Sequence, residues 1–228
     1  MHAGDPALRE QLLHQARRLQ PLGLATGTSG NLSVRIDLGL HGGMLITPSG
    51  IAYDTLRPDD LVAVEFTGPG TARWQHALDP SSEWLMHQAI YQARTEAGAV
   101  VHGHPTYATV LAIQGLEIPA LHYMVAAAGG APIRCAPYHT YGTAALSQAA
   151  VAALVGRKAC LLAHHGLLVF EHDLAKAMWL AGAVETLAQQ LVMCLALGGP
   201  RLLPAHEIDL VVEKFSHYGL KTAGPGPR

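Results

Sequence analysis

Apolar residues recur at helical spacing in the first twenty residues of the chain and in shorter runs after them. Leu8, Leu12 and Leu19 fall on one face of a 3.6-residue repeat. The Pro-Leu-Gly sequence at residues 21–23 then ends the repeat, because proline and glycine rarely continue a helix. These positions predict an opening helix with one buried face.

Three short apolar or alternating runs follow, at residues 32–36, 44–46 and 61–66, each bounded by Gly, Pro or Asp. Runs of this length and punctuation predict strands. We expect no helix between them, so these strands pair antiparallel instead of through the helical crossovers of a parallel sheet. The first part of the chain therefore argues against a doubly wound parallel fold.

Helical and strand patterns alternate through the rest of the chain. Helices are expected at about residues 83–94, from 105, and at 143–154, 173–197 and 206–218. Strands are expected in the run ending at His102 and at residues 132–135, 159–163 and 167–170. We predict one α/β (α+β) domain over residues 1–220 with a mainly antiparallel sheet. The Gly- and Pro-containing tail, residues 221–228, is expected to be disordered.

Composition narrows the class of protein. The chain is 50% hydrophobic and 14% charged, and this low charge suggests that part of the surface is buried against other subunits. The net charge is −2 and no Lys/Arg cluster occurs beyond Arg17-Arg18 and Arg157-Lys158, so nucleic-acid binding has little electrostatic basis. Neither a signal-type segment nor an apolar stretch of ~20 residues is evident, so we expect a cytoplasmic protein with no membrane partner. Scattered cysteines suit a reducing compartment: Cys135, Cys160 and Cys194.

Histidines stand at the ends of two of the predicted strands. His102 and His104 are one residue apart, so they point to the same side of an extended chain. His164 and His165 follow a second apolar run. Three imidazoles that converge from strand ends form an open zinc site with a position left for water or substrate. The alternative for each histidine is a structural, hydrogen-bonded role, and spacing alone does not choose between His164 and His165.

Small and hydroxylated residues make up three loops, at residues 26–31, 47–50 and 79–82. Backbone N–H groups, serine hydroxyls and a helix N-terminus all bind phosphate, although turn and capping roles are the alternative. The first loop is neither a Walker loop nor a dinucleotide fingerprint, because a strand follows it. Glu83 comes directly after the third loop, where it either interacts favourably with the positive end of the helix dipole or acts as a general acid or base.

Seven segments together resemble one family. In chain order they are residues 27–35 (GTSGNLSVR), 46–50 (ITPSG), 81–84 (SSEW), 101–104 (VHGH), 121–124 (LHYM), 126–130 (AAAGG) and 164–167 (HHGL). The chain resembles the zinc-dependent class II sugar-phosphate aldolases over about residues 8–220. This family belongs to a superfamily with pentulose-phosphate 4-epimerases and adducin heads. Ser29 and Ser49 stand where family members can carry alanine and threonine, and both changes are mild.

The resemblance implies an antiparallel sheet covered by helices on both faces, in a cyclic homotetramer with active sites between neighbouring subunits. It assigns one zinc ion per subunit to His102, His104 and His165. Glu83 becomes the catalytic acid/base, and it also ligates zinc in the free site. Tyr123 and Tyr218 enter from the neighbouring subunit as catalytic residues, with interface packing as the alternative. The resemblance also implies that the substrate phosphate is bound by Thr28, Gly30, Asn31, Ser49, Gly50, Ser81 and Ser82.

The activity implied is that of a lyase in sugar-phosphate metabolism. A ketose 1-phosphate such as L-fuculose 1-phosphate would undergo retro-aldol cleavage to dihydroxyacetone phosphate and an aldehyde such as L-lactaldehyde, which would place the enzyme in fucose metabolism. Aldolases for 5-deoxyribulose 1-phosphate or methylthioribulose 1-phosphate remain alternatives. The 4-epimerases carry Asp where this chain has Glu83, and adducin-like interaction domains lack the metal histidines.

Overall fold

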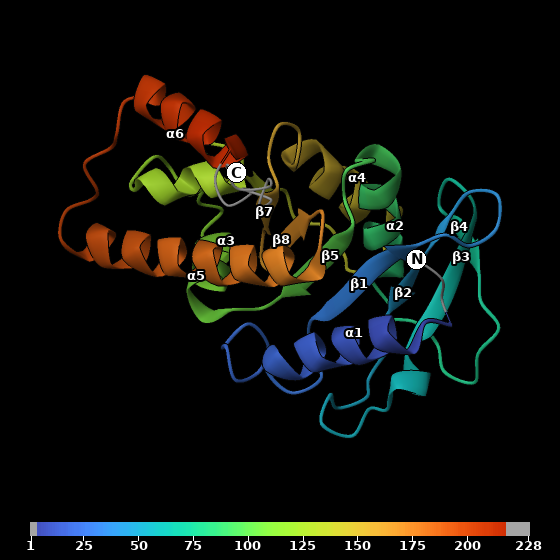
Figure 1. Ribbon diagram of the computed structural model, residues 1–228. Helices are drawn as coiled ribbons and strands as arrows, with labels where there is room; N and C mark the ends of the chain where they lie inside the picture. The colour runs from blue at the N-terminus through green and yellow to red at the C-terminus, as the bar shows by residue number, and fades with distance from the viewer. Residues whose placement is uncertain (1–3, 218–228) are drawn as a thin grey trace, which may run out of the picture.

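A computed structural model describes residues 4–217, so the expected tail at 221–228 and Tyr218 lie outside the described residues. An eight-stranded sheet in the order β4-β3-β2-β1-β5-β8-β7-β6 runs through the centre (Figure 1). Its neighbours pair antiparallel except β6 and β7, which pair parallel. This confirms the mainly antiparallel sheet. The strands are β1 (Asn31–Ile36), β2 (Gly43–Ile46), β3 (Val62–Gly68), β4 (Thr71–Arg73), β5 (Ala99–Gly103), β6 (Cys135–Ala136), β7 (Ala159–Leu162) and β8 (Gly166–Glu171).

Helices cover both faces of the sheet, as expected. The first face carries α1 (Pro6–Arg18), α3 (Thr106–Ile113), α5 (Leu174–Ala196) and the 3-10 helix η2 (Tyr123–Ala128). The second face carries α2 (Trp84–Ala93) and α4 (Ala144–Ala153). The remaining helices are the short η1 (Pro58–Asp60) and α6 (Ala205–His217), which packs on η2.

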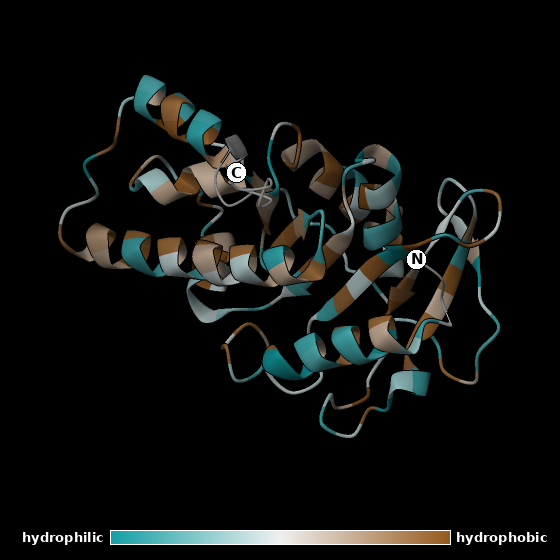
Figure 2. Cartoon of the chain, viewed as in Figure 1, coloured by the Kyte–Doolittle hydropathy of each residue, from teal (hydrophilic) through white to brown (hydrophobic). Residues whose placement is uncertain are grey.

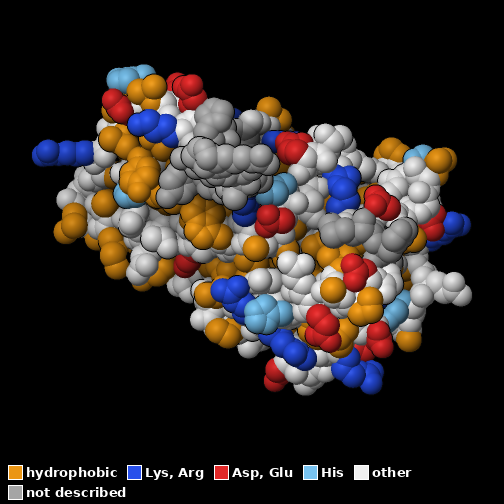
Figure 3. Space-filling view, viewed as in Figure 1, with side chains coloured by type: hydrophobic (Ala, Val, Ile, Leu, Met, Phe, Trp, Pro, Cys, Tyr) orange, Lys and Arg blue, Asp and Glu red, His pale blue; other side chains and the backbone are white. Residues whose placement is uncertain are grey.

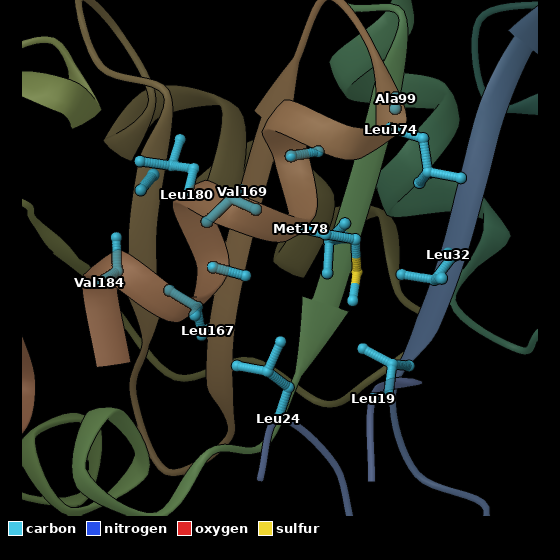
Figure 4. Close-up of a cluster of buried hydrophobic side chains, with 14 of the residues drawn as sticks. Leu19, Leu24, Leu32, Ala99, Leu167, Val169, Leu174, Met178, Leu180 and Val184 are labelled. Atoms are coloured by element: carbon cyan, nitrogen blue, oxygen red, sulfur yellow. The ribbon is translucent and has the colours of Figure 1, made fainter. Parts of the chain in front are cut away.

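Alternation along the strands divides their side chains between two apolar cores. In β8, Leu167 and Val169 enter the core on the α5 side, whereas Leu168 and Phe170 enter the core under α2 and α4. Figure 4 shows the first of these cores, with Met178 of α5 lying against the strands. Because both faces of β7 and β8 are buried, residues 159–162 and 167–170 are continuously apolar, as the brown of β8 in Figure 2 illustrates.

Helix α5 departs from one expectation. It is 23 residues long and contains an 18-residue window with a mean hydropathy of 1.3, so by length and composition alone it could cross a membrane, whereas we expected no stretch to qualify. Its buried side chains, among them Leu174, Met178 and Val184, belong to the core over the sheet. Core packing therefore accounts for much of its apolar character.

Two edge strands differ from the prediction. The strand expected at residues 132–135 is only Cys135–Ala136, and Ile133 instead forms a single bridge with Ile118. Its parallel pairing with β7 follows from the crossover through α4. Strand β4 was not predicted, because its three residues Thr-Ala-Arg carry no apolar alternation.

Strand β1 has a polar face that is nevertheless covered. Asn31, Ser33 and Arg35 alternate with three apolar residues, a pattern typical of a strand with one face in water. Asn31 and Ser33 are 3% and 0% exposed, because α2 packs over them. Arg35 donates to the carbonyls of Tyr91, Arg94 and Ala97 at the end of α2. A row of buried polar groups therefore leads along β1 toward the end of β5.

Candidate active site

Three imidazoles and one carboxylate meet where β5 ends. His102 and His104 come from the end of β5, and His165 comes from the turn between β7 and β8. Their ligand nitrogens lie within 4.8 Å of one another. Glu83 reaches this group from the start of α2, with Oε2 3.1 Å from His102 Nε2 and Oε1 3.3 Å from His165 Nε2. The structure thus brings together all four predicted metal-site residues.

Strand pairing explains this convergence. Gly103 of β5 faces Leu167 of β8, so the end of one strand lies beside the turn that starts the other. A side chain at Gly166 would contact the Gly103 carbonyl and come within 2.7 Å of His104 Cδ2. Glycine at this position therefore allows the close approach that sets His165 beside His104.

The structure also separates the adjacent histidines that the sequence leaves undecided. His165 joins the cluster. His164 has a φ of +53°, a left-handed conformation that is uncommon outside glycine. Its ring meets Tyr138 edge-on at 6.0 Å instead of the other imidazoles. His165 is therefore the candidate ligand, as the family resemblance implies.

These four residues fit a divalent metal ion of the zinc type. His102 Nδ1 lies 2.9 Å from the Leu167 carbonyl, so it donates there, and Nε2 is the ring nitrogen that faces the cluster. Burial, followed by the neighbouring His102, lowers the pKa of His104 and His165 to about 4. Both imidazoles are then neutral at pH 7, which is the metal-binding form. Nitrogen and carboxylate donors in this number suit zinc.

Glu83 occupies the N-cap position of α2 but makes no capping hydrogen bond. Its side chain turns into the site and is 6% exposed. Burial alone would raise the pKa of Glu83, but His102, His165 and the Asn31 amide outweigh it and hold the pKa well below its usual range. Oε1 is buried and has no hydrogen-bond partner among the described residues. An ionised carboxylate oxygen in that position suits a cation or a transferable proton.

A cavity of about 340 Å³ opens beside this cluster, and all seven predicted phosphate-binding residues line it: Thr28, Gly30, Asn31, Ser49, Gly50, Ser81 and Ser82. Two of its loops are bound together, because Ser49 N–H donates to Asp79 O at 3.1 Å and Ser81 N–H donates to Thr47 O at 3.0 Å. No lysine or arginine occurs among the described residues that line the cavity. The cavity therefore offers an anion neutral hydroxyl, amide and backbone donors.

Several residues around the site carried no recognisable pattern in the sequence. Tyr138, His139 and Tyr141 line the cavity from the irregular segment between β6 and α4. His87 is fully buried beneath the cluster. One feature of the sequence could have indicated its place near the site: it follows Glu83 by four residues, and residues at that spacing lie on the same side of a helix.

The predicted tyrosines are not part of this cavity in the described chain. Tyr123 lies on η2, is 50% exposed and stacks on His122, away from the residues that line the cavity. Tyr218 lies outside the described residues.

Comparison with known proteins identifies the family. The sequence matches the family described as "Class II Aldolase and Adducin N-terminal domain" over residues 10–192. This match covers most of the chain, and the chain belongs to that family. Class II aldolases are metal-dependent enzymes, in agreement with the cluster of His102, His104 and His165. The protein is an aldolase, a lyase that breaks a carbon–carbon bond.

Named relatives come from two substrate groups. The chain is 49% identical to a 5-methylthioribulose-1-phosphate/5-deoxyribulose-1-phosphate aldolase of Rhodospirillum rubrum, over 97% of this chain and 96% of the relative. It is 46% identical to the L-fuculose phosphate aldolase of Escherichia coli, over 94% and 96% of the two chains. A solved L-fuculose 1-phosphate aldolase superposes with a TM-score of 0.84 at 39% identity, covering 91% of this chain and 95% of that one.

Proposed function

We propose that this protein is a zinc-dependent aldolase that cleaves a ketose 1-phosphate to dihydroxyacetone phosphate and an aldehyde. One observation carries the proposal: a carboxylate and three imidazoles share a cavity with loops rich in hydroxyl and backbone donors. The carboxylate and imidazoles suit a metal ion that binds the oxygens of a substrate, and the loops suit a phosphate. A sugar phosphate needs both in one cavity.

His102, His104 and His165 would hold the zinc ion, with Glu83 as a fourth ligand before substrate binds. Zinc supplies a Lewis acid that stabilises negative charge on the substrate oxygens beside the bond to be broken, an effect worth several kcal/mol. The Leu167 carbonyl keeps His102 in the required tautomer. No lysine is needed as a Schiff base, in keeping with a cavity whose described lining contains none.

The phosphate would bind at the opposite loops, on Gly30, Ser49, Ser81 and their neighbours. Each hydrogen bond to a charged group contributes roughly 1.5–3 kcal/mol, so four or five of them anchor a dianion without a basic side chain. The hydrogen bonds between residues 47–49 and 79–81 fix the two loops before substrate arrives. This preorganisation reduces the entropy that binding would otherwise cost.

Glu83 would move the proton. Its side chain lies at the junction of the cluster and the cavity. Its ionised form would accept the proton that the substrate hydroxyl beside the breaking carbon–carbon bond loses. After the carbon–carbon bond breaks, Glu83 delivers that proton to the carbon of the dihydroxyacetone phosphate enediolate. Positioned acid–base groups of this kind contribute about 10²–10⁴-fold in rate. Tyr123 and Tyr218 of a neighbouring subunit would complete the proton transfers on the aldehyde side.

A homotetramer would supply those tyrosines. Apolar side chains are exposed in the region of α5 in Figure 3. The exposed apolar residues of α5 include Trp179, Met193 and Leu195. A second cavity of about 640 Å³ runs along the same helix and reaches His122, beside Tyr123. An apolar surface of this kind supports association.

The substrate has two leading candidates. The relative in Rhodospirillum rubrum acts on methylthioribulose 1-phosphate and 5-deoxyribulose 1-phosphate, and the relative in Escherichia coli on L-fuculose phosphate, at nearly equal identity to this chain. These sugars share the phosphate and carbonyl end and differ at the aldehyde end. Tyr138, His139 and Tyr141 line the cavity on segments outside the phosphate loops, so they are the residues to compare. Glu83 argues against an epimerase.

The test is a coupled assay for dihydroxyacetone phosphate release, with and without a chelator. L-Fuculose 1-phosphate, 5-deoxyribulose 1-phosphate and methylthioribulose 1-phosphate are compared by kcat/KM. Chelator-sensitive release, restored by zinc, supports the proposal, and the ratio of kcat/KM values identifies the substrate group. Release that survives complete metal removal, or no release from any of the three, overturns it.

A further inference from the structure

Five buried side chains form an unbroken hydrogen-bonded line that ends on Glu83. Tyr91 OH lies 2.8 Å from Ser33 Oγ, and Ser33 Oγ lies 2.7 Å from His87 Nδ1. His87 Nε2 lies 2.5 Å from Asn31 Oδ1, and Asn31 Nδ2 lies 3.0 Å from Glu83 Oε2. Three residues of the line come from α2 and its N-cap, and two come from the covered polar face of β1.

Every hydrogen bond in this line has one permitted direction. The ionised Glu83 carboxylate only accepts, so Asn31 presents its Nδ2 amide there and its carbonyl Oδ1 to His87. That carbonyl also only accepts, so His87 donates from Nε2. Burial lowers the pKa of His87 to about 3, so the ring is neutral and its Nδ1 is an acceptor. Ser33 therefore donates to Nδ1 and accepts from Tyr91.

We propose that His87 is a positioning residue for the aldolase reaction, which locks the Asn31 amide so that its Nδ2 group, not its carbonyl, faces Glu83. This inference rests on the proposed function of Glu83 in proton transfer. His87 itself belongs neither to the cluster nor to the residues that line the cavity. It acts through Asn31 alone, from the far side of the amide.

The lock matters because an asparagine amide is nearly symmetric in shape. Without a donor at Oδ1, the amide can rotate and set its carbonyl against the Glu83 carboxylate, where two acceptors repel. Glu83 then turns away or loses its partner, and the carboxylate is no longer held for proton transfer. Alignment of successive donors toward one acceptor also strengthens each bond in the line. Removal of a residue that holds a metal ligand in place in this way typically lowers activity about 10–100-fold.

The first test reads the tautomer of His87 without substrate or metal. Nitrogen-15 NMR of the chelator-treated protein distinguishes protonated from unprotonated ring nitrogens, and the His87→Gln spectrum assigns the His87 signals by their loss. The expected result is a neutral ring protonated at Nε2. A ring protonated at Nδ1, or one exchanging between both forms, would refute the proposal that His87 fixes the orientation of the Asn31 amide. This holds whether or not the protein is an aldolase.

The second test is kinetic, on zinc-loaded protein with the best substrate of the coupled assay. His87→Leu should lower kcat about 10–100-fold while KM changes less, because the phosphate loops at residues 47–50 and 79–82 are not among the hydrogen-bond partners of His87. His87→Gln, whose amide carries a donor near the former Nε2 position, should recover most of that loss. Equal losses in the two variants overturn the proposal.

A packing control separates positioning from general destabilisation. Ile90 lies on the same helix, is fully buried in the apolar core and has no polar contact to lose. Ile90→Ala should lower the melting temperature at least as much as His87→Leu and yet keep kcat within a few-fold of wild type. An equal kcat loss in Ile90→Ala would mean that loosening α2 is sufficient, and the positioning role would be refuted. If wild type itself cleaves no sugar phosphate, the proposed function fails while the NMR result still decides the lock.

Discussion

Protonation of His87 should destabilise the protein in acid, and His87→Gln should remove that part of the acid sensitivity. The imidazole is completely buried between Ser33 and Asn31. Burial and then His102 lower its pKa to about 3, and Glu83 offsets this only in part. In the unfolded chain a histidine has a pKa of about 6.5. Between pH 6.5 and 3 the unfolded state therefore holds a proton that the folded state does not.

The sign and size of the effect follow from this difference. Stability rises with pH wherever the unfolded state binds more protons, so the contribution of His87 is complete above about pH 6.5 and is lost as the pH falls toward 3. Full separation of the two pKa values gives a slope of about 1.4 kcal/mol per pH unit. Between pH 6.5 and 4.5 the integrated loss is about 2 kcal/mol.

Urea unfolding with chelator present, at pH 6.5 and pH 4.5, measures this loss directly. Wild type should lose about 2 kcal/mol more free energy of unfolding between these two pH values than His87→Gln does. Groups that titrate in both proteins cancel in the comparison. His14→Ala, which removes an exposed imidazole from α1, is the control for losing a histidine. Equal losses in wild type and His87→Gln would refute the assignment of a neutral, buried His87.

Three further substitutions test the site. His104→Ala should remove metal binding and activity but preserve the circular-dichroism spectrum, and full activity of metal-free protein would contradict the metal site. Glu83→Gln should retain metal by elemental analysis and lose about 10²–10⁴-fold in kcat, so an unchanged rate would exclude Glu83 from proton transfer. Gly166→Ala should lower metal affinity and cost about 1–3 kcal/mol of stability, because its methyl group meets the Gly103 carbonyl and His104. Gly182→Ala on α5, where an added methyl meets nothing within 4 Å, should have neither effect.

Much of the site could be predicted because its ligands follow strands. His102 and His104 share a face by the two-residue period of β5, and apolar runs before them and before His165 marked the strand ends. The loops were recognisable from their small and hydroxylated residues. The choice between His164 and His165 depends on one left-handed backbone angle, which spacing does not encode.

The parts that were missed depend on tertiary contacts. The alternation in β1 is typical of a strand that faces water, whereas α2 covers that face and makes Asn31 and Ser33 internal hydrogen-bond partners. His87 was not singled out, because its spacing of four residues from Glu83 does not by itself distinguish a packed ring in an apolar helix from a functional one. The parallel strand β6 is two residues long, too short to produce a sequence period.

The division between strand-borne and loop-borne residues has a consequence for how such an enzyme can evolve. His102 and His165 are tied to the paired ends of β5 and β8, whereas Tyr138, His139 and Tyr141 project from a connection without regular structure. Substitutions in that connection alter the wall of the cavity without disturbing strand register or ligand spacing. Substitutions that change substrate preference can therefore accumulate in this connection by drift or selection, while the histidines at the strand ends stay unchanged.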